Sequence, residues 1–234
     1  MPVTVLAHPL LARCSRMPER EAARAALGLP AQDEILALLP GSRRSELERM
    51  LPRFARTVAE LRALGPASLP VVALAQPEHV SLLEATWSKA APDAPLPEIR
   101  IGRAGEVLAA ADAVLVASGT ATLETALVGR PAVVVYAVHP LTYAIARRLV
   151  RTPFIAMPNI LLGEAVYPEY VQDAFDPETV ARRLVSVLGA EGARQRERLR
   201  GLPALLHGEG LEAIGKVLAR IFHQTGPDPA IHPG

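Results

Sequence analysis

Short apolar runs alternate with helix-like segments along a large part of this chain, and this alternation limits the folds that it can adopt. Apolar runs predict strands at residues 35–39, 69–75, 113–117 and 131–136, and residues 99–101 form a further short candidate strand. A strand that is apolar throughout must be covered on both faces, and helices between successive strands provide that cover. The pattern therefore predicts an α/β fold: a Rossmann-like parallel sheet with helices on both faces, followed by C-terminal helices.

The 234 residues suit one large domain or two small ones. We expect four parts: an N-terminal segment with a short helix over 1–30, a Rossmann-like domain over 31–190, C-terminal helices over 191–224 and a disordered tail over 225–234. Residues 1–11 are expected to be extended, and a loop is expected from 158 to 168. Further helices are predicted at residues 141–150, 169–173, 177–189, 191–200 and 209–223.

The composition excludes several classes of function. Basic and acidic residues nearly cancel, at 25 and 24, so we expect no nucleic-acid partner. The single cysteine, Cys14, excludes an intramolecular disulfide framework and a cysteine-rich zinc site, and the six histidines have no metal-like spacing. No apolar run is long enough to span a membrane, and the first eleven residues lack a signal-peptide pattern. We therefore expect a cytoplasmic protein.

A glycine turn follows the apolar run of residues 35–39 and precedes a helix. Gly41 lets the backbone approach a ligand, the helix start offers backbone N–H groups, and Arg43 can pair with a phosphate through two hydrogen bonds. Ser45 followed by Glu48 fits a capping box at the start of this helix. The same residues also fit a plain strand-to-helix turn with solvated arginines.

A second turn, residues 118–124, follows the run at 113–117. Ligands of open α/β sheets bind beyond the C-terminal ends of the strands, where both turns are predicted to lie. Thr120 opens a helix, and Glu124 lies one turn further along the same side, where it could accept hydrogen bonds from hydroxyls. In the alternative, Thr120 only caps the helix and Glu124 is a surface charge. Taken alone, Asn159 and Gln172 fit an ordinary turn and an ordinary helix.

Five stretches occur in the order expected for one family of enzymes. They are residues 38–46 (LLPGSRRSE), 117–124 (ASGTATLE), 140–143 (PLTY), 146–150 (ARRLV) and 158–161 (PNIL). On these stretches, the chain resembles the C-terminal half of lipid-A-disaccharide synthase, an inverting glycosyltransferase of the two-domain GT-B architecture. The resemblance runs from about His8 to about Phe222.

The resemblance implies a role in lipid A biosynthesis: transfer of 2,3-diacylglucosamine from UDP to 2,3-diacylglucosamine 1-phosphate. The product would be a β-1,6 disaccharide, with UDP released on the cytoplasmic side of the inner membrane. In this architecture the C-terminal half holds the UDP-sugar. No metal or other cofactor is expected, since arginines and helix starts would offset the charge of the leaving UDP.

The resemblance also assigns roles to individual residues. Gly41, Ser42 and Arg43 would bind the pyrophosphate. Ser118, Gly119 and Thr120 would supply amides and a hydroxyl to the phosphates, and Glu124 would accept hydrogen bonds from the ribose hydroxyls. Asn159 would lie near the uracil or the diphosphate, and Gln172 in the same cleft.

The chain begins where the N-terminal domain of the family should already have ended. That domain is expected to supply the acceptor site and the general base. We therefore expect no catalytic residue in this chain, and no activity without the missing domain or a complementing chain. The last helices are expected to expose apolar faces. A homodimer and a peripheral contact with the inner membrane are compatible with the resemblance, and the arginines of residues 141–151 suit such a contact or a solvated helix face.

Two alternatives remain open. Another UDP-sugar enzyme of the same architecture, such as a muramyl-pathway transferase or a UDP-sugar epimerase, would explain the glycine turn and Glu124 equally well. Residues 146–150 and 158–159 favour the lipid A interpretation. The chain could also be a non-catalytic domain that binds UDP without transferring a sugar.

Overall fold

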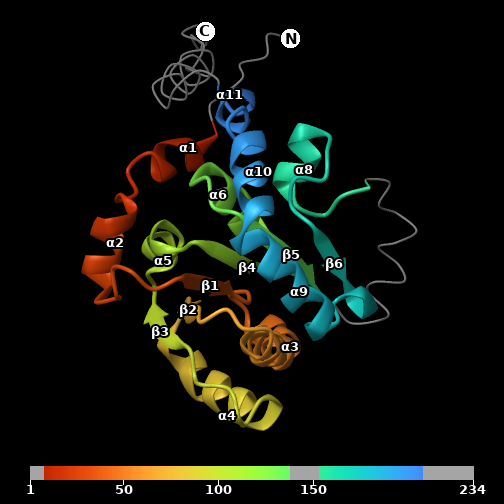
Figure 1. Ribbon diagram of the computed structural model, residues 1–234. Helices are drawn as coiled ribbons and strands as arrows, with labels where there is room; N and C mark the ends of the chain where they lie inside the picture. The colour runs from red at the N-terminus through yellow and green to blue at the C-terminus, as the bar shows by residue number, and fades with distance from the viewer. Residues whose placement is uncertain (1–7, 138–152, 208–234) are drawn as a thin grey trace, which may run out of the picture.

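The computed structural model describes residues 8–137 and 153–207. Within these residues, six parallel strands form one sheet in the order β3-β2-β1-β4-β5-β6 (Figure 1). Their bounds are β1 Ile35–Leu39, β2 Leu69–Leu74, β3 Glu98–Ile101, β4 Ala113–Ala117, β5 Ala132–Tyr136 and β6 Glu169–Val171. The first five strands are the five strands predicted from the sequence, shifted by at most a residue at either end.

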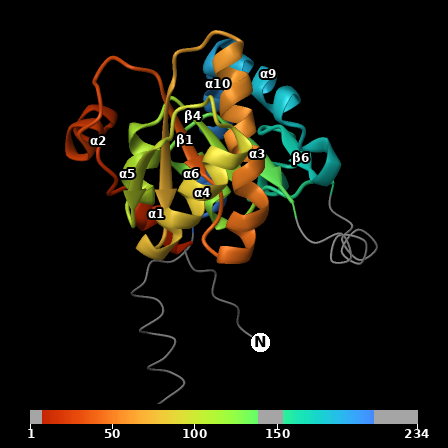
Figure 2. The same ribbon diagram turned by 90° about the horizontal axis from the view of Figure 1, so that it is seen from below.

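Helices cover both faces of the sheet (Figures 1 and 2). One face carries α3 (Arg44–Ala63), α4 (Val80–Ala90) and α9 (Pro177–Leu188), and α3 and α4 lie nearest the viewer in Figure 2. The other carries α2 (Arg20–Leu27), α5 (Ala104–Ala110) and α6 (Thr120–Leu127). The remaining described helices are α1 (Pro9–Cys14), η1 (Pro77–His79), α8 (Met157–Leu162), η2 (Gln172–Ala174), α10 (Ala190–Leu199) and α11 (Leu202–Leu205). This arrangement confirms the predicted Rossmann-like α/β fold.

Alternate residues of each strand enter two separate cores, because successive side chains of a strand point to opposite faces. Leu36 and Leu38 of β1 pack with the apolar stripe of α3, which includes Phe54. Ile35 and Ala37 pack with α2, α5 and α6. The stripe predicted along α3 is buried at each of its positions: Leu47, Leu51, Phe54, Val58 and Leu61.

Strand order reverses at β1, which pairs with β2 on one side and with β4 on the other. Leu39, the last residue of β1, is in register with Val116 near the end of β4. The turns that follow these two strands therefore lie side by side. In open α/β sheets this reversal leaves a crevice beyond the carboxyl ends of the strands.

Three predicted segments are wrong. Residues 9–14 form α1 instead of an extended segment, because Pro9 suits the first helical turn and His8 Nδ1 accepts a hydrogen bond from Leu10 N. The predicted loop from residue 158 starts with helix α8, since Pro158 again suits a first turn and Gly163 ends the helix with φ 68°.

The third wrong segment is the helix predicted at residues 169–173. It is β6 followed by η2, because residues 169–171 pair with β5 and extend the sheet. Helices α9 and α10 confirm the predictions at 177–189 and 191–200. The predictions for residues 141–150, 209–223 and 225–234, with Arg147, Arg148 and Arg151, lie outside the described residues.

A buried arginine ties α2 to the edge of the sheet where the strands begin. Arg24 is 1% exposed, and its guanidinium donates to the carbonyl oxygens of Ala110, Ala31 and Asp33 at 3.0, 2.6 and 2.8 Å. It also donates to Asp112 Oδ2 at 2.6 Å. These charge-assisted bonds satisfy an arginine that has no access to water.

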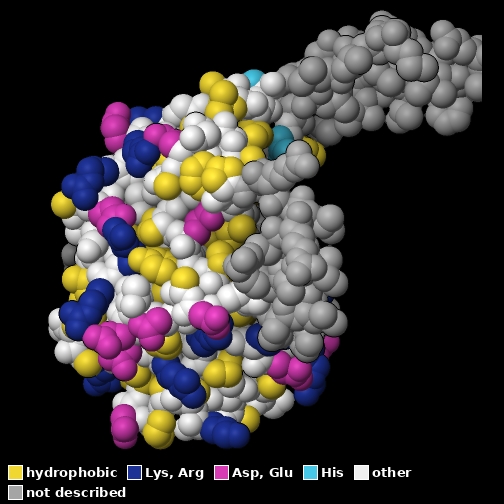
Figure 3. All heavy atoms as spheres, turned by 90° about the vertical axis from the view of Figure 1, so that its right-hand side faces the viewer, with side chains coloured by type: hydrophobic (Ala, Val, Ile, Leu, Met, Phe, Trp, Pro, Cys, Tyr) yellow, Lys and Arg dark blue, Asp and Glu magenta, His cyan; other side chains and the backbone are white. Residues whose placement is uncertain are grey.

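The surface of the described residues mixes apolar and charged side chains. Figure 3 shows hydrophobic side chains scattered among charged ones on the face that Figure 1 draws on its right. Ile160 and Leu161 of α8 and Leu205 of α11 are among the exposed large hydrophobic residues. None of the described helices combines the length and apolar character needed to cross a membrane.

Candidate functional site

A cleft of about 640 Å³ opens beyond the carboxyl ends of the strands. Its walls come mainly from the turns after β1 and β4, and the ends of β2, β3 and β5 complete it. Six of the nine residues singled out by the sequence line it: Gly41, Ser42, Arg43, Ser118, Gly119 and Thr120. Glu124, Asn159 and Gln172 do not line it.

The first turn is organised by a carboxylate. Glu46 Oε2 accepts hydrogen bonds from the backbone N–H groups of Ser42 and Arg43, at 3.2 and 3.3 Å, and Oε1 accepts one from Arg43 Nη1 at 3.3 Å. Glu46 thus supplies the reciprocal half of a capping box by accepting from the backbone N–H of the N-cap residue Arg43, whose guanidinium cannot accept a hydrogen bond in return. The predicted capping box of Ser45 and Glu48 is wrong, because α3 has Arg43 as its N-cap. A side chain at Gly41, which has φ 118°, would come within 2.8 Å of Glu46 Oε2, so the turn requires glycine.

The second turn offers backbone donors to the cleft. The backbone N–H groups of Gly119, Thr120 and Ala121 at the start of α6 donate no hydrogen bond to any described residue. The N–H of Ser118 is not available to a ligand, because it donates to Val135 O at 2.9 Å. The Ser118 hydroxyl donates to Ile155 O at 3.1 Å. A Cβ placed on Gly119 would meet no atom within 4 Å, so its backbone faces open space.

The two turns face the cleft with complementary groups for an anion. The side chain of Arg43 is 81% exposed, so its guanidinium can turn toward a ligand. Across the cleft, the unpaired N–H groups at the start of α6 carry the positive end of the helix dipole. A cation on one side and free amides on the other can hold a phosphate or diphosphate between them.

Glu124 lies one turn into α6 and faces α1. Its Oε1 accepts a hydrogen bond from Arg13 Nη1 at 3.0 Å, and its side chain is 12% exposed. This charge also raises the pKa of Cys14, although burial of the thiol is the larger cause. The resemblance pointed to Glu124, but its partner Arg13 was not predicted, because the two residues lie 111 positions apart in the chain.

Asn159 is fully buried within a network that holds the chain before α8. Its Nδ2 donates to Tyr167 O at 2.8 Å and to Glu169 Oε1 at 2.7 Å, and its Oδ1 accepts from Tyr167 N at 2.9 Å. Glu169 also accepts from the backbone N–H groups of Ile155 and Ala156. Ile155 O accepts a hydrogen bond from the hydroxyl of Ser118, which lines the cleft. The network therefore helps to fix one wall of the cleft.

Gln172 follows β6, at the sheet edge where the other strands also end. It has φ 55°, a left-handed conformation that is costly for a residue other than glycine. Its carbonyl oxygen accepts a hydrogen bond from Arg53 Nη1 of α3 at 3.1 Å, and the Arg53 guanidinium lies 5.5 Å from the centre of the Phe175 ring. The stacking of Arg53 on Phe175 orients its guanidinium, and the hydrogen bond from Arg53 to Gln172 O helps to hold the left-handed backbone conformation of Gln172.

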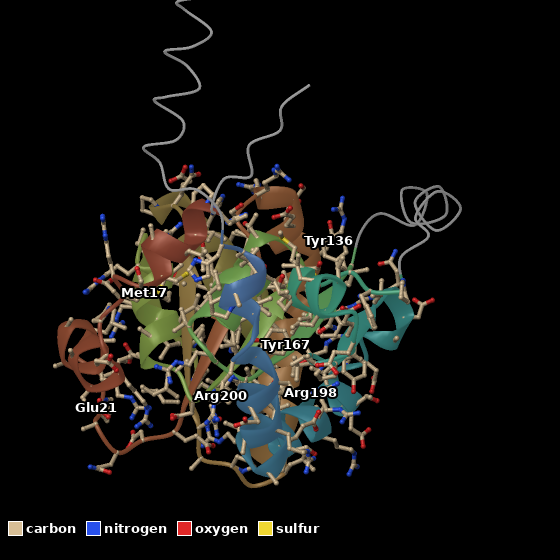
Figure 4. All side chains as sticks on the ribbon, turned by 90° about the horizontal axis from the view of Figure 1, so that it is seen from above. Met17, Glu21, Tyr136, Tyr167, Arg198 and Arg200 are labelled. Atoms are coloured by element: carbon tan, nitrogen blue, oxygen red, sulfur yellow. The ribbon has the colours of Figure 1, made fainter. Side chains whose placement is uncertain are left out.

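Sequence reasoning missed several residues of the cleft, among them Glu46 and Tyr136. Tyr136, labelled in Figure 4, ends β5 beside the turn that follows β4. The rule that carboxyl ends of parallel strands share one edge would have found it. No cluster of His, Cys, Asp and Glu side chains suited to a metal ion occurs among the residues that the structure describes.

The fold and the cleft define an α/β domain of the GT-B glycosyltransferase type. Its solved structural neighbours include the spinosyn rhamnosyltransferase SpnG complexed with thymidine diphosphate, with a TM-score of 0.57 and 19% sequence identity. That comparison covers 94% of this chain and 57% of the other. At this identity the likeness shows the fold alone.

Sequence comparisons identify the family. A family described as lipid-A-disaccharide synthetase matches residues 1–206. The lipid-A-disaccharide synthases of Azotobacter vinelandii and Verminephrobacter eiseniae are 47% and 45% identical to the chain over 194 and 177 residues. The matches cover 82% and 76% of this chain and 50% and 45% of those proteins, so the chain spans about half of their length. The chain belongs to the lipid-A-disaccharide synthetase family, as the resemblance indicated.

Proposed function

We propose that this chain is the UDP-sugar-binding half of a lipid-A-disaccharide synthase. The observation that carries the proposal is the cleft at the β1–β4 crossover, where Arg43 faces the unpaired amides of α6. On the basis of family membership, we further propose UDP-2,3-diacylglucosamine as the donor and 2,3-diacylglucosamine 1-phosphate as the acceptor lipid.

In this proposal the diphosphate lies between the guanidinium of Arg43 and the N–H groups of Gly119, Thr120 and Ala121. Glu124 accepts hydrogen bonds from the ribose hydroxyls. Asn159 acts by holding the chain segment that contacts Ser118, since its own amide is used within the protein. Gln172 is a further candidate contact at the same sheet edge.

The chemical contribution of this half is to stabilise the leaving group. When the acceptor hydroxyl attacks the anomeric carbon of the donor sugar, the bond to the β-phosphate breaks and negative charge grows on UDP. The Arg43 cation and the fixed amide dipoles of α6 favour that charge, so the proposal needs no metal. We assign the general base and the acceptor site to an N-terminal half, and the reaction to the cytoplasmic side of the inner membrane.

A complementation assay tests this function. The chain would be mixed with the N-terminal half of the Azotobacter vinelandii relative, and UDP release would be measured with the acylated donor and the acceptor lipid. We expect the mixture to release UDP and form the disaccharide, and each half alone to do neither. UDP-N-acetylglucosamine is the matched donor without acyl chains, and we expect far slower release from it.

Two results would contradict the proposal in different ways. UDP binding by the chain without transfer in the mixture would favour a non-catalytic UDP-binding domain. Faster release from the unacylated donor would favour another UDP-sugar enzyme of this architecture.

A further inference from the structure

Arg13 of α1 reaches the carboxylate that we assign to the ribose. Its Nη1 donates to Glu124 Oε1 at 3.0 Å, although its side chain is 59% exposed and has water as an alternative partner. The helix that carries it is itself fixed. His8 caps α1 through Leu10 N at 3.2 Å, and the backbone N–H of His8 donates to Leu206 O at 3.1 Å.

The two oxygens of Glu124 have different surroundings. Oε1 is taken by Arg13, whereas none of the described residues donates a hydrogen bond to Oε2. The Glu124 side chain is 12% exposed, and Oε2 is not among the fully buried, unpaired side-chain atoms of the described residues, so this oxygen keeps some access to solvent. A carboxylate can accept through both oxygens at once. Holding one oxygen therefore fixes the orientation of the other and leaves it available.

We infer that Arg13 is a positioning residue for Glu124, which lies on α6 outside the lining of the cleft, and that it gives the proposed nucleotide site its preference for a ribonucleotide over a 2′-deoxyribonucleotide. The inference rests on the proposed function, in which Glu124 binds the ribose hydroxyls. Arg13 does not contact the ligand in this arrangement. It restricts the rotation of the Glu124 side chain, so that Oε2 is directed at the hydroxyls before the nucleotide arrives. Such preorganisation raises affinity because less side-chain freedom is lost on binding.

The competing explanation is that the pair only attaches α1 to α6. In that case, loss of Arg13 would loosen α1 and lower stability, but it would not change how the cleft distinguishes two ligands that differ by one hydroxyl. A ratio of affinities for such ligands therefore separates the two explanations, because a general loss of stability affects both ligands equally.

Calorimetric titrations with UDP and 2′-deoxy-UDP provide that ratio. Hydrogen bonds to a charged group are strong, so we expect the unmodified chain to bind UDP about tenfold more tightly than 2′-deoxy-UDP. In Arg13→Gln we expect the preference to fall to about threefold or less, mainly through weaker UDP binding. Arg13→Lys keeps the charge and should restore part of the preference. Arg16→Gln is the matched control on the same segment, is exposed, and should keep the full preference.

Glu124→Gln distinguishes failure of this inference from failure of the proposed function. Loss of the preference in Glu124→Gln but not in Arg13→Gln would overturn the role of Arg13 and leave Glu124 as the ribose ligand. An unchanged preference in Glu124→Gln would overturn the ribose assignment and the inference together. Loss in Arg13→Gln and Glu124→Gln, with partial rescue by Arg13→Lys, is the result that the inference predicts.

Discussion

Glu46 and Arg43 determine how the first turn of the cleft can receive an anion. The carboxylate of Glu46 already accepts from the backbone N–H groups of Ser42 and Arg43. This turn therefore offers a side chain instead of its backbone, and the free amides lie across the cleft on α6. The planar guanidinium of Arg43 can bind a phosphate through two parallel hydrogen bonds, which lysine cannot do.

The pKa of Cys14, the single cysteine of the chain, depends on the charges of Arg13 and Glu124, so this thiol can serve as a probe of both residues. Burial raises the pKa of the thiol, the charge of Glu124 raises it further, and Arg13 lowers it. We expect Glu124→Gln to lower this pKa and Arg13→Gln to raise it. Because the thiolate is the reactive form, alkylation by iodoacetamide at mildly alkaline pH should be faster in Glu124→Gln and slower in Arg13→Gln than in the unmodified chain. Equal pKa values in the three proteins, read from the pH dependence of the rate, would show that neither charge acts on the thiol, contrary to the arrangement described here.

Some turn residues of the cleft could be singled out from their place in the chain, whereas partners that lie far apart in sequence could not be predicted. Gly41 and Arg43 could be singled out because their turn follows a strand and precedes a helix. The partners of Glu124 and Asn159 could not, since Arg13 lies in a helix that the sequence pattern did not predict, and Tyr167 meets Asn159 only once α8 has formed.

Among the elements, α2 depends most clearly on a single buried side chain. Arg24 connects this helix to Asp112 and to carbonyl groups near the start of β1. We expect Arg24→Met to lower the free energy of unfolding by about 3–5 kcal/mol, because it leaves the buried carbonyl oxygen of Ala110 and part of the Asp112 charge unpaired. Urea denaturation followed by circular dichroism measures the change.

Arg20 provides the matched control for Arg24. It pairs with the other oxygen of Asp112 at 2.5 Å, but its side chain is 36% exposed. Because water can replace part of this contact, Arg20→Met should cost clearly less than Arg24→Met. An equal cost, or a negligible cost for Arg24→Met, would show that burial does not determine the strength of this network.

The elements that sequence patterns predicted well are the buried strands. β4 coincides with its apolar run, and β1 does the same, because strands covered on both faces exclude polar residues. Strand β6 was missed for a different reason. β6 lies at the edge of the sheet and is only half-buried, so its three residues carry little apolar signal. Its structure comes from pairing with β5.

For the molecule as a whole, the sheet order places two turns that are distant in sequence at one crevice. The alternation of strands and helices predicted the fold class and the edge of the sheet at which the cleft lies. It could not predict that β1 would neighbour β4, although that pairing brings residues 41–43 and 118–120 to the same cleft. The chain spans about half the length of these relatives, and in our proposal the cleft holds the donor side of the reaction.

Calorimetric titration with UDP tests most directly the claim that the two turns form a diphosphate site. Arg43→Met removes the exposed cation that lines the cleft, and we expect it to weaken UDP binding about tenfold or more. Arg44→Met removes the neighbouring arginine, which does not line the cleft and pairs with Glu48 on the surface at 2.9 Å. We expect that variant to bind UDP within about twofold of the unmodified chain. Equal losses in the two variants, or no measurable UDP binding by the unmodified chain, would contradict the account.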